Sequence, residues 1–258
     1  MLEHVINISS STLVSSLTGW RGTTGSKKTK LPEQEIVLFD RESCEECRLV
    51  RQAITELNLN VLVYPCPEQG NRYRPLLEDM SGASQLPFLF DQNTGQKLTG
   101  SDAVLEYLFS QYADKPVPKK FKEASENGLL NAVKQKAIST LRGGRGETVK
   151  SSREAEQTLT LYSFESSPFS RPVRELLCEL ELAYRLVNLG KQQKADMGPA
   201  VQRFHLGPYI PVKGSKREAF LKQYNEVMVP FLIDPNTGTE LFQSKKILAY
   251  LKREYALK

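Results

Sequence analysis

The feature that most constrains this 258-residue chain is that it repeats itself. The stretch PFLFDQNTGQKLTGSDAVLEYL, from Pro87, returns as PFLIDPNTGTELFQSKKILAYL from Pro230, at a constant offset of 143 residues. Upstream, LFDRESCEEC and LYSFESSPFS align Cys44 with Ser167 at an offset of 123. The second copy therefore carries about twenty more residues between these anchors, which we place within 189–225. The self-similarity indicates two copies of one small domain.

Each copy shows the same succession of patterns. A short apolar run typical of a strand is followed by a helix-periodic segment and a second strand, a third strand begins at the proline, and an Asn-Thr-Gly turn leads into a fourth. The final helix begins near Ser101 or Ser244, where a hydroxyl can cap the backbone N–H groups or help to hold a carboxylate. The expected strands include 36–39, 61–64 and 88–90 in the first copy and 159–162, 184–187 and 231–233 in the second.

This order of elements resembles the thioredoxin-like plan, in which a β-helix-β unit forms a parallel strand pair with a right-handed crossover. We therefore expect an α/β protein with two tandem thioredoxin-like domains joined by a linking helix. The expected division is an N-terminal extension (1–34), domain 1 (35–114), a linking helix with a flexible joint (115–157) and domain 2 (158–258). Apolar residues at helical spacing between 129 and 141 predict the helix, and RGGRGETVKSS predicts the joint.

Charge and hydropathy limit the classes of partner. The formal net charge is +5, and the basic residues are scattered along the chain. No nucleic-acid-binding motif accompanies them, so we interpret the excess as solvated surface and expect no nucleic-acid partner. No run approaches the roughly 18 apolar residues that a membrane span requires, so we expect no membrane span.

The four cysteines, at 44, 47, 66 and 178, are too few and too irregular for a secreted disulfide framework. They indicate a reducing compartment, and we expect a cytoplasmic protein. Segment 1–34 is rich in Ser and Thr and poor in acids, so a plastid stroma is the alternative location. Because Leu13, Leu17 and Trp20 fall at helical spacing there, we favour a short helix that docks on the body of the protein.

The pair Cys44 and Cys47 is the strongest candidate for chemistry. Cys44 is expected at the N-terminus of a helix, where unpaired N–H groups and the helix dipole lower the pKa of a thiol. Cys47, one turn further on, is within reach to form a disulfide with Cys44 and to resolve a mixed disulfide, a step that glutathione could also perform. Glu45 and Glu46 oppose the thiolate, so we expect a less acidic thiol than a Pro-aromatic dipeptide would give. Two inert thiols are the alternative interpretation.

A metal site is another interpretation of two cysteines three residues apart. Cys66 lies in the same copy and His4 is remote, so no second pair completes a set of four ligands. We therefore expect no resident metal, but an iron–sulfur or metal carrier that dimerises through Cys44 stays open. Cys178 falls on the apolar face of its helix and is expected in the core.

Two prolines lie where a thiol of this kind would meet its substrate. Pro87 and Pro230 begin the third strand of each copy and face the N-terminus of the first helix of that copy. In the thioredoxin-like plan the X-Pro bond at this place is cis, so Leu86 and Val229 could offer their backbone to an extended peptide thiol. Trans prolines that merely begin a strand are the alternative, since cis X-Pro bonds are uncommon.

These segments resemble a known family. ESCEEC with LPFLFD and NTG, and ESSPFS with VPFLIDPNTG, are similar to the N-terminal domain of glutathione S-transferases and to glutaredoxins. More closely, residues 35–258 resemble the tandem glutathione S-transferase N-terminal-domain proteins of cyanobacteria and plastids, including RYRP at 72–75, with GWRG at 19–22 before them. The resemblance implies glutathione as cosubstrate or ligand.

The resemblance also implies a glutathione groove in the first copy, with Cys44 as nucleophile, Leu86 and Pro87 holding the cysteinyl backbone, and Ser101 and Asp102 at the γ-glutamyl end. The equivalent positions of the second copy are Ser167, Ser170, Val229, Pro230, Gln243 and Ser244. A serine cannot form a disulfide, so we expect the second copy to be redox-inactive. After residue 113 the chain has no room for the all-helical domain that completes the electrophile site of a glutathione transferase, which argues against conjugation of xenobiotics.

Three functions agree with these observations. We favour a glutaredoxin-like thiol–disulfide oxidoreductase that uses Cys44 and Cys47, with glutathione or a thiol-containing protein as its partner. The alternative is a non-catalytic module in which degenerate thioredoxin-fold sites bind glutathione or a protein segment. The third is a metal or iron–sulfur carrier.

Overall fold

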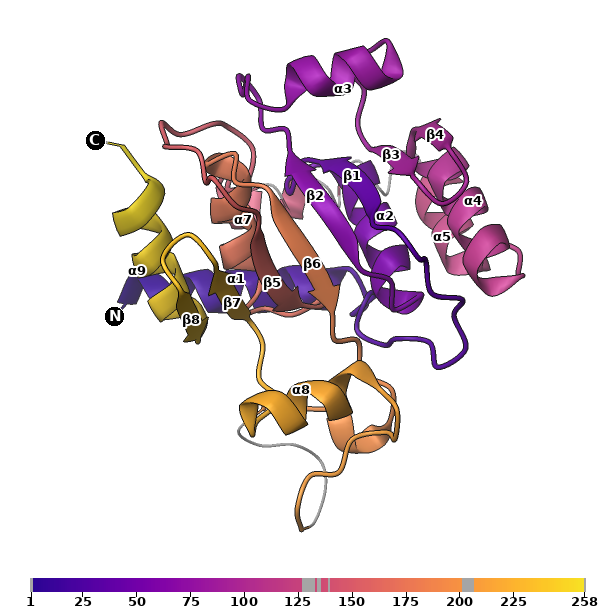
Figure 1. Ribbon diagram of the computed structural model, residues 1–258, viewed down its shortest axis with the longest axis vertical. Helices are drawn as coiled ribbons and strands as arrows, with labels where there is room; N and C mark the ends of the chain where they lie inside the picture. Colours follow the sequence, from indigo (N-terminus) through magenta and orange to yellow (C-terminus); the bar gives the residue numbers. More distant parts are fainter. Residues whose placement is uncertain (1, 127–132, 134–135, 139, 201–206, 258) are drawn as a thin grey trace.

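The computed structural model describes residues 2–126, 133, 136–138, 140–200 and 207–257. Within this part of the chain, eight strands form one mixed sheet in the order β4-β3-β1-β2-β6-β5-β7-β8 (Figure 1). The first copy supplies β1 (Ile36–Asp40), β2 (Val61–Pro65), β3 (Phe88–Asp91) and β4 (Gln96–Thr99). The second supplies β5 (Leu159–Ser163), β6 (Tyr184–Asn188), β7 (Phe231–Asp234) and β8 (Thr239–Phe242). In each copy a parallel pair precedes an antiparallel hairpin, which confirms the predicted thioredoxin-like fold.

Equivalent helices follow equivalent strands in the two copies. The parallel strands are connected by α2 (Glu45–Glu56) and α7 (Arg171–Glu179), and the copies end with α4 (Ser101–Ala113) and α9 (Ser244–Tyr255). The third strands follow α3 (Arg74–Ser81) and α8 (Lys216–Tyr224), which lie at opposite ends of the molecule (Figure 1). The fold also contains α1 (Leu2–Leu17), α5 (Lys119–Glu126) and the short 3₁₀ helix η1 (Lys194–Asp196).

The additional residues of the second copy lie where the sequence predicted them. Segment 189–215 connects β6 to α8, whereas segment 66–73 is sufficient between β2 and α3. The linking helix expected between 129 and 141 lies largely outside the described residues.

The two copies join through β2 and β6, which pair antiparallel. The register sets Val61 opposite Leu186 and Val63 opposite Tyr184. Val61 and Tyr184 are equivalent positions of the two copies, and so are Val63 and Leu186. Exchange of the two copies therefore converts the pair Val61–Leu186 into the pair Tyr184–Val63, and the reverse. The copies are therefore related by a pseudo-twofold axis that passes between β2 and β6. The sequence predicted two domains but not this continuous sheet.

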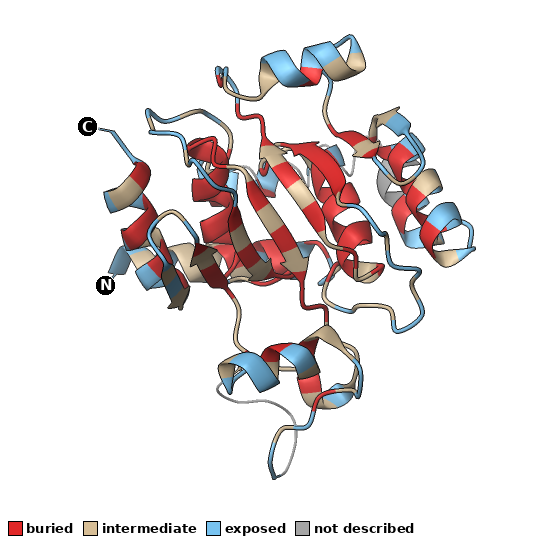
Figure 2. Ribbon diagram, viewed as in Figure 1, coloured by how far each residue is buried: buried red, intermediate tan, exposed pale blue. Residues whose placement is uncertain are grey.

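One face of the sheet carries a hydrophobic core that both copies share. Side chains of α2 and α4 form a single buried cluster with those of α7 and α9 and with the strands beneath them. The other face has two separate cores, one around Leu77 of α3 and one around Phe220 of α8. Buried and half-buried residues accordingly alternate along β2 and β6 (Figure 2). The copies are thus fused along one face and separate along the other.

A carboxylate fixes the end hairpin of each copy to its last helix. Asp91, at the end of β3, accepts hydrogen bonds from the hydroxyls of Tyr107, at 2.7 Å, and Tyr112 of α4. In the second copy Asp234 accepts the same bonds from Tyr250, at 2.7 Å, and Tyr255 of α9. The adjacent Asn-Thr-Gly turns, which the sequence predicted, are held by the same carboxylates. This arrangement explains why both copies have the same residues here.

The N-terminal helix docks on the second copy, but through a different face from the one expected. The three residues whose spacing predicted it are exposed: Leu13 by 53%, Leu17 by 44% and Trp20 by 43%. The buried residues of α1 are Ser11, Val14 and Ser15. The contact is largely polar, because the Ser15 hydroxyl donates to the Ser166 carbonyl at 2.8 Å and Arg171 donates to the Ser11 carbonyl at 3.0 Å. Helical spacing identified the helix, but its apolar side is not its docking side.

Each copy is preceded by an arm that crosses to the other copy. The sequence GWRG at 19–22 corresponds to GGRG at 143–146, a further repeat at an offset of 124 residues that sequence analysis missed. The Ser166 N–H donates to the Gly22 carbonyl at 3.2 Å, and the Ser43 N–H donates to the Gly146 carbonyl at 3.3 Å. The arm of the first copy therefore closes over the second copy, and the arm of the second closes over the first. The segment interpreted as a flexible joint is bonded in this way to the first copy.

Candidate active site

Cys44 lies at the N-cap position of α2. After β1 ends at Asp40, the chain turns and places Cys44 in an extended conformation, directly before the first residue of the helix. Its Sγ accepts a hydrogen bond from the Cys47 backbone N–H at 3.4 Å. The sulfur therefore occupies the place that a serine or aspartate oxygen takes in an ordinary N-cap, where the helix dipole favours an anion. The side chain of Cys44 is partly exposed, and that of Cys47 is buried.

The pKa values of the two thiols are shifted in opposite directions. The pKa of Cys44 is lowered to about 6, chiefly because the Cys47 thiol donates a hydrogen bond to its sulfur. Burial of Cys44 acts in the opposite direction but is outweighed. Burial, together with that donated bond, raises the pKa of Cys47 well above its usual value. Glu45 and Glu46, which we expected to oppose the thiolate, do not prevent this. At pH 7 Cys44 is mainly a thiolate and Cys47 is a thiol.

The positions expected to hold glutathione lie at the same end of the first copy. The antiparallel pairing of β1 with β3 sets Pro87 beside the C-terminal end of β1, where the turn to Cys44 begins. The Leu86–Pro87 and Val229–Pro230 peptide bonds are both cis, as predicted. The Gly100 N–H donates to the Pro87 carbonyl at 2.9 Å, and α4 begins at the next residue. The start of α4 is thereby fixed to the proline.

The predicted capping of the last helices by serine is wrong. Ser101 and Ser244 are buried, but each is already the first residue of its helix, and no side chain caps α4 or α9. The N-cap positions belong to Gly100 and Gln243, both with positive φ, so the chain leaves the hairpin one residue earlier than we expected. Asp102 is exposed in the first turn of α4.

The equivalent of the thiol site is closed in the second copy. The Ser170 hydroxyl donates to Ser167 Oγ at 2.9 Å, and both side chains are no more than 2% exposed. The neighbouring Ser166 carbonyl is bonded to Ser15 of α1, so the N-terminal helix lies against this site. Of the other equivalents, Val229 and Pro230 are at most half-exposed and Gln243 is exposed. The structure thus contains one accessible site and one covered site.

A buried ionic cluster lies between these two sites, and sequence analysis missed it. Arg51 of α2 and Arg174 of α7 each contact both Glu42 and Glu165, at N–O distances between 2.9 and 3.4 Å. Asp40 adds a contact of 2.6 Å to Arg51. The two arginines, and the two glutamates, occupy equivalent positions at the offset of 123. That offset was the available signal, because ES followed by R-x-V-R occurs in both copies.

Among the described residues, no group of three or more His, Cys, Asp or Glu side chains is arranged to hold a metal ion. Cys66 and Cys178 are both buried, and burial raises the pKa of Cys66 to about 12 and that of Cys178 well above its usual value. Neither thiol is therefore reactive at neutral pH.

No helix in the described ranges combines the length and the hydropathy needed to cross a bilayer.

The fold and the N-cap thiol define a thioredoxin-like protein with a cysteine at the start of the helix that follows its first strand. The family model described as glutathione S-transferase, N-terminal domain, matches residues 38–116 and 161–258. These segments cover more than half of the chain, which therefore belongs to the glutathione S-transferase N-terminal-domain family. No curated protein and no solved structure matches the chain.

Proposed function

We propose that the first copy is a glutathione-dependent thiol–disulfide oxidoreductase with Cys44 as its nucleophile. One observation carries the proposal: a partly exposed thiol with a pKa of about 6 sits at a helix N-terminus and accepts a hydrogen bond from a second, buried thiol. A thiolate is the reactive form in disulfide exchange, and a pKa near or below the ambient pH keeps it available. The substrate is a mixed disulfide between glutathione and the thiol of a protein or small molecule.

The reaction runs in two exchanges. The Cys44 thiolate attacks the glutathione sulfur of the mixed disulfide, a Cys44–glutathione disulfide forms, and the substrate sulfur leaves as a thiolate that takes up a proton. A second glutathione, as its thiolate, then attacks the glutathionyl sulfur on Cys44. Oxidised glutathione is released, and Cys44 leaves as the thiolate with which the cycle began. Each cycle converts one mixed disulfide and one glutathione into one free thiol and one oxidised glutathione.

In this proposal Cys47 positions and stabilises Cys44 rather than resolving the intermediate. An attacking sulfur must be a thiolate and must be accessible, whereas Cys47 is fully buried with a raised pKa. As a hydrogen-bond donor it stabilises the Cys44 thiolate before the first attack and when that thiolate leaves in the second. The burial of Cys47 thus favours glutathione as the resolving thiol.

We assign the binding of glutathione to Leu86 and Pro87, with Ser101 and Asp102 at the γ-glutamyl end. The second copy is assigned no redox step, because Ser167 and Ser170 are bonded to each other beneath α1. Its role is to complete the sheet and the ionic cluster against which the Cys44 turn packs. The protein works in a reducing compartment, the cytoplasm or the plastid stroma, which agrees with its four free cysteines.

We also infer that the chain is of the tandem type found in cyanobacteria and plastids. The support is structural, since two of the segments on which that resemblance rests lie at the junction of the copies. Arg72 of RYRP donates to the Glu181 and Ser152 carbonyls, at 2.6 and 3.0 Å, and GWRG forms the first arm. We assign the two domains to residues 35–114 and 158–258, with 1–34 and 115–157 as the extension and the connecting segment.

The proposal is tested by a titration of the full chain in glutathione redox buffers, with adducts located by mass spectrometry, and by assays of deglutathionylation. We expect a reversible glutathione adduct on Cys44, loss of activity in Cys44→Ser, and retained activity in Cys47→Ser. Cys66→Ser, a change at a buried thiol of the same copy, is the matched control and should behave as the wild type. If Cys44 stays unmodified and Cys44→Ser keeps full activity, the oxidoreductase proposal fails and a binding module takes its place.

A further inference from the structure

The solvent side of α1 is apolar, the reverse of an ordinary surface helix, which turns its apolar side to the core. Its large exposed side chains and that of the following turn form what we call the apolar stripe: Leu2, Val5, Ile6, Leu13, Leu17 and Trp20, exposed by 43% to 73%. At 3.6 residues per turn, the five residues within α1 fall on one side of the helix. Only Ser9 and Ser16 lie among them, so the stripe contains no charge.

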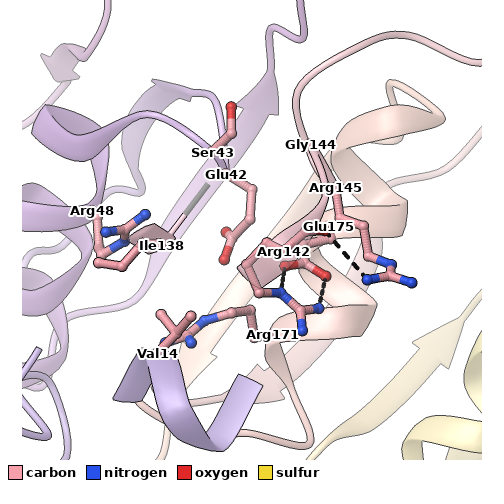
Figure 3. Close-up of a pocket in the computed structure, with 10 residues that line it drawn as sticks. All are labelled: Val14, Glu42, Ser43, Arg48, Ile138, Arg142, Gly144, Arg145, Arg171 and Glu175. Atoms are coloured by element: carbon pink, nitrogen blue, oxygen red, sulfur yellow. Dashed lines mark hydrogen bonds and ion pairs between the residues drawn. The ribbon is translucent and has the colours of Figure 1, made fainter. Parts of the chain in front are cut away.

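The opposite side of α1 holds the helix on the protein. Val14 lines a small cavity together with Arg142 and Arg171 (Figure 3). Arg142 donates to the Asn7 carbonyl at 2.9 Å. Arg171 donates to the Ser11 carbonyl at 3.0 Å. Because these contacts fix the orientation of α1, the apolar stripe faces away from the core.

The stripe is a cluster and not a scatter of single residues. It contains half of the large apolar side chains that are exposed in the described ranges, and all of them come from one helix and its last turn. Single exposed apolar residues are normal on a protein surface, whereas a contiguous patch marks a site of interaction. The stripe is therefore expected to have a partner.

The nearby helix α9 shows what kind of partner fits. Four cations lie on its solvent side and all are exposed: Lys245, Lys246, Lys252 and Arg253, which we call the basic face. The pKa of His4 in α1 is lowered by burial and, next, by the charge of Lys245, so the start of α9 lies near the start of α1. Both are at the same end of the molecule (Figure 1). The basic face thus adjoins the apolar stripe.

The basic face is not a property of the repeated fold. At the offset of 143, the equivalent positions in α4 are Asp102, Ala103, Phe109 and Ser110. None of these residues is basic, and one is an acid. The basic face is therefore present only in the copy on which α1 docks.

We propose that the apolar stripe and the basic face together dock the protein on an anionic lipid bilayer. The side chains of the stripe enter the boundary between headgroups and acyl chains, and the lysines of α9 meet the acidic headgroups. With 16 residues, α1 lies in the surface of the bilayer and does not span it. A second copy of the chain fits less well, because it carries the same basic face and supplies no complementary charge.

Docking is tested with the full chain and vesicles of phosphatidylcholine, with or without phosphatidylglycerol. Trp20 is the only tryptophan of the chain, so its fluorescence reports on the stripe directly. We expect its emission to shift to shorter wavelength with the anionic vesicles, and less with phosphatidylcholine alone. If the emission does not change and the protein stays in the supernatant when the anionic vesicles are sedimented, the proposal is wrong.

The stripe is tested by Leu13→Glu, which places a charge among the inserted side chains. The affinity for anionic vesicles should fall at least about tenfold, because one large apolar side chain no longer enters the bilayer. Leu76→Glu, a change at an exposed leucine of α3, is the matched control and should bind as the wild type. Both leucines are exposed, so both variants should keep the thermal unfolding midpoint of the wild type. Undiminished binding in Leu13→Glu contradicts the proposal.

The basic face is tested by the double variant Lys245→Gln, Lys252→Gln. Its affinity for anionic vesicles should fall about fivefold for each lysine, and its affinity for phosphatidylcholine should not change. Lys97→Gln, at an exposed lysine of β4, should bind as the wild type. Equal losses in the double variant and in Lys97→Gln would overturn the assignment to α9. A dimer of the full chain that forms without lipid and dissociates in Leu13→Glu would assign the stripe to a second copy instead.

Discussion

At the scale of single residues, the two cysteines of one short motif differ because a helix turn separates them. Cys44 is the N-cap of α2, at the end of the helix where backbone N–H groups are unpaired. Cys47 lies one turn inside the helix and is buried in the core. One four-residue motif therefore contains one anionic and one neutral sulfur. The serines of the second copy keep this arrangement, because Ser170 donates to Ser167 through its backbone N–H and its hydroxyl, as Cys47 donates to Cys44.

The pKa of Cys44 makes its alkylation dependent on pH in a predictable way. The rate with iodoacetamide should rise as the pH passes about 6 and level off above it, because the thiolate is the reactive species. Cys47→Ala removes the main cause of the lowered pKa, so the inflection should move to higher pH. Cys66→Ala, which also removes a buried thiol of the first copy, should leave the pH of the inflection unchanged. An unchanged inflection in Cys47→Ala would show that Cys47 does not stabilise the thiolate.

The ionic cluster is expected to respond strongly to the loss of one member. Arg51→Met removes the ion-pair partner of Asp40 and one of the two arginines that contact Glu42 and Glu165, and breaking a buried pair in this way costs about 3–5 kcal/mol. Arg185→Met breaks an exposed pair with Glu35, which is worth about 0–1 kcal/mol. Urea unfolding of the two variants measures the difference. Similar midpoints would mean that the cluster contributes little to stability.

At the scale of elements, each arm depends on one glycine that lies against the other copy: Gly22 in the first arm and Gly146 in the second. Gly146 has φ of +74°, and a Cβ there would lie 2.9 Å from the Glu42 Cβ. Gly143, in the same arm, has φ of +58° but open space around a Cβ. The two positions thus share the unfavourable backbone and differ in the steric conflict.

This pair permits a matched test of the arm. Gly143→Ala should cost about 1–2 kcal/mol through the left-handed backbone alone. Gly146→Ala should cost at least about 1 kcal/mol more, because the new methyl group displaces the Glu42 turn. Unfolding by denaturant measures both. Equal losses would mean that the arm yields without disturbing the ionic cluster.

The elements were largely predictable from the sequence, since apolar runs, helical spacing and the Asn-Thr-Gly turns determine them locally. The contacts between elements were not. The docking face of α1 consists of serines, which carry no hydropathy signal, and the arms are bonded through backbone groups. The place of Cys44 at a helix N-terminus and the cis bond before Pro87 were predicted, because both belong to a recurrent pattern. The arginines of the junction were missed because nothing in the local sequence distinguishes a buried arginine from a solvent-exposed one.

At the scale of the whole molecule, the pseudo-twofold junction resembles the interface of a symmetric dimer. Each copy contributes one strand edge, one Glu–Arg pair and one crossing arm, and all of these are equivalent at the repeat offsets. A chain made only of residues 1–114 still contains a complete set. Two such chains can therefore form the contacts that the tandem protein forms within itself.

We expect the fragment 1–114 to form a homodimer through β2, with Arg51 of each chain paired to Glu42 of the other. Sedimentation equilibrium should give a dimer mass, and Arg51→Met in the fragment should shift the equilibrium towards monomer. A folded fragment that stays monomeric at all concentrations would contradict the symmetry argument.

The joining of two equivalent halves in one chain has a consequence for how such a protein can evolve. In a homodimer every substitution appears twice, so neither site can change without the other. In the tandem chain a substitution appears once, and Ser167 can take the place of cysteine while Cys44 keeps its thiol. The arginines and glutamates of the junction gain no such freedom, because each of them contacts its counterparts from both halves. Duplication thus relaxes selection on the second site while it preserves the junction that both halves share.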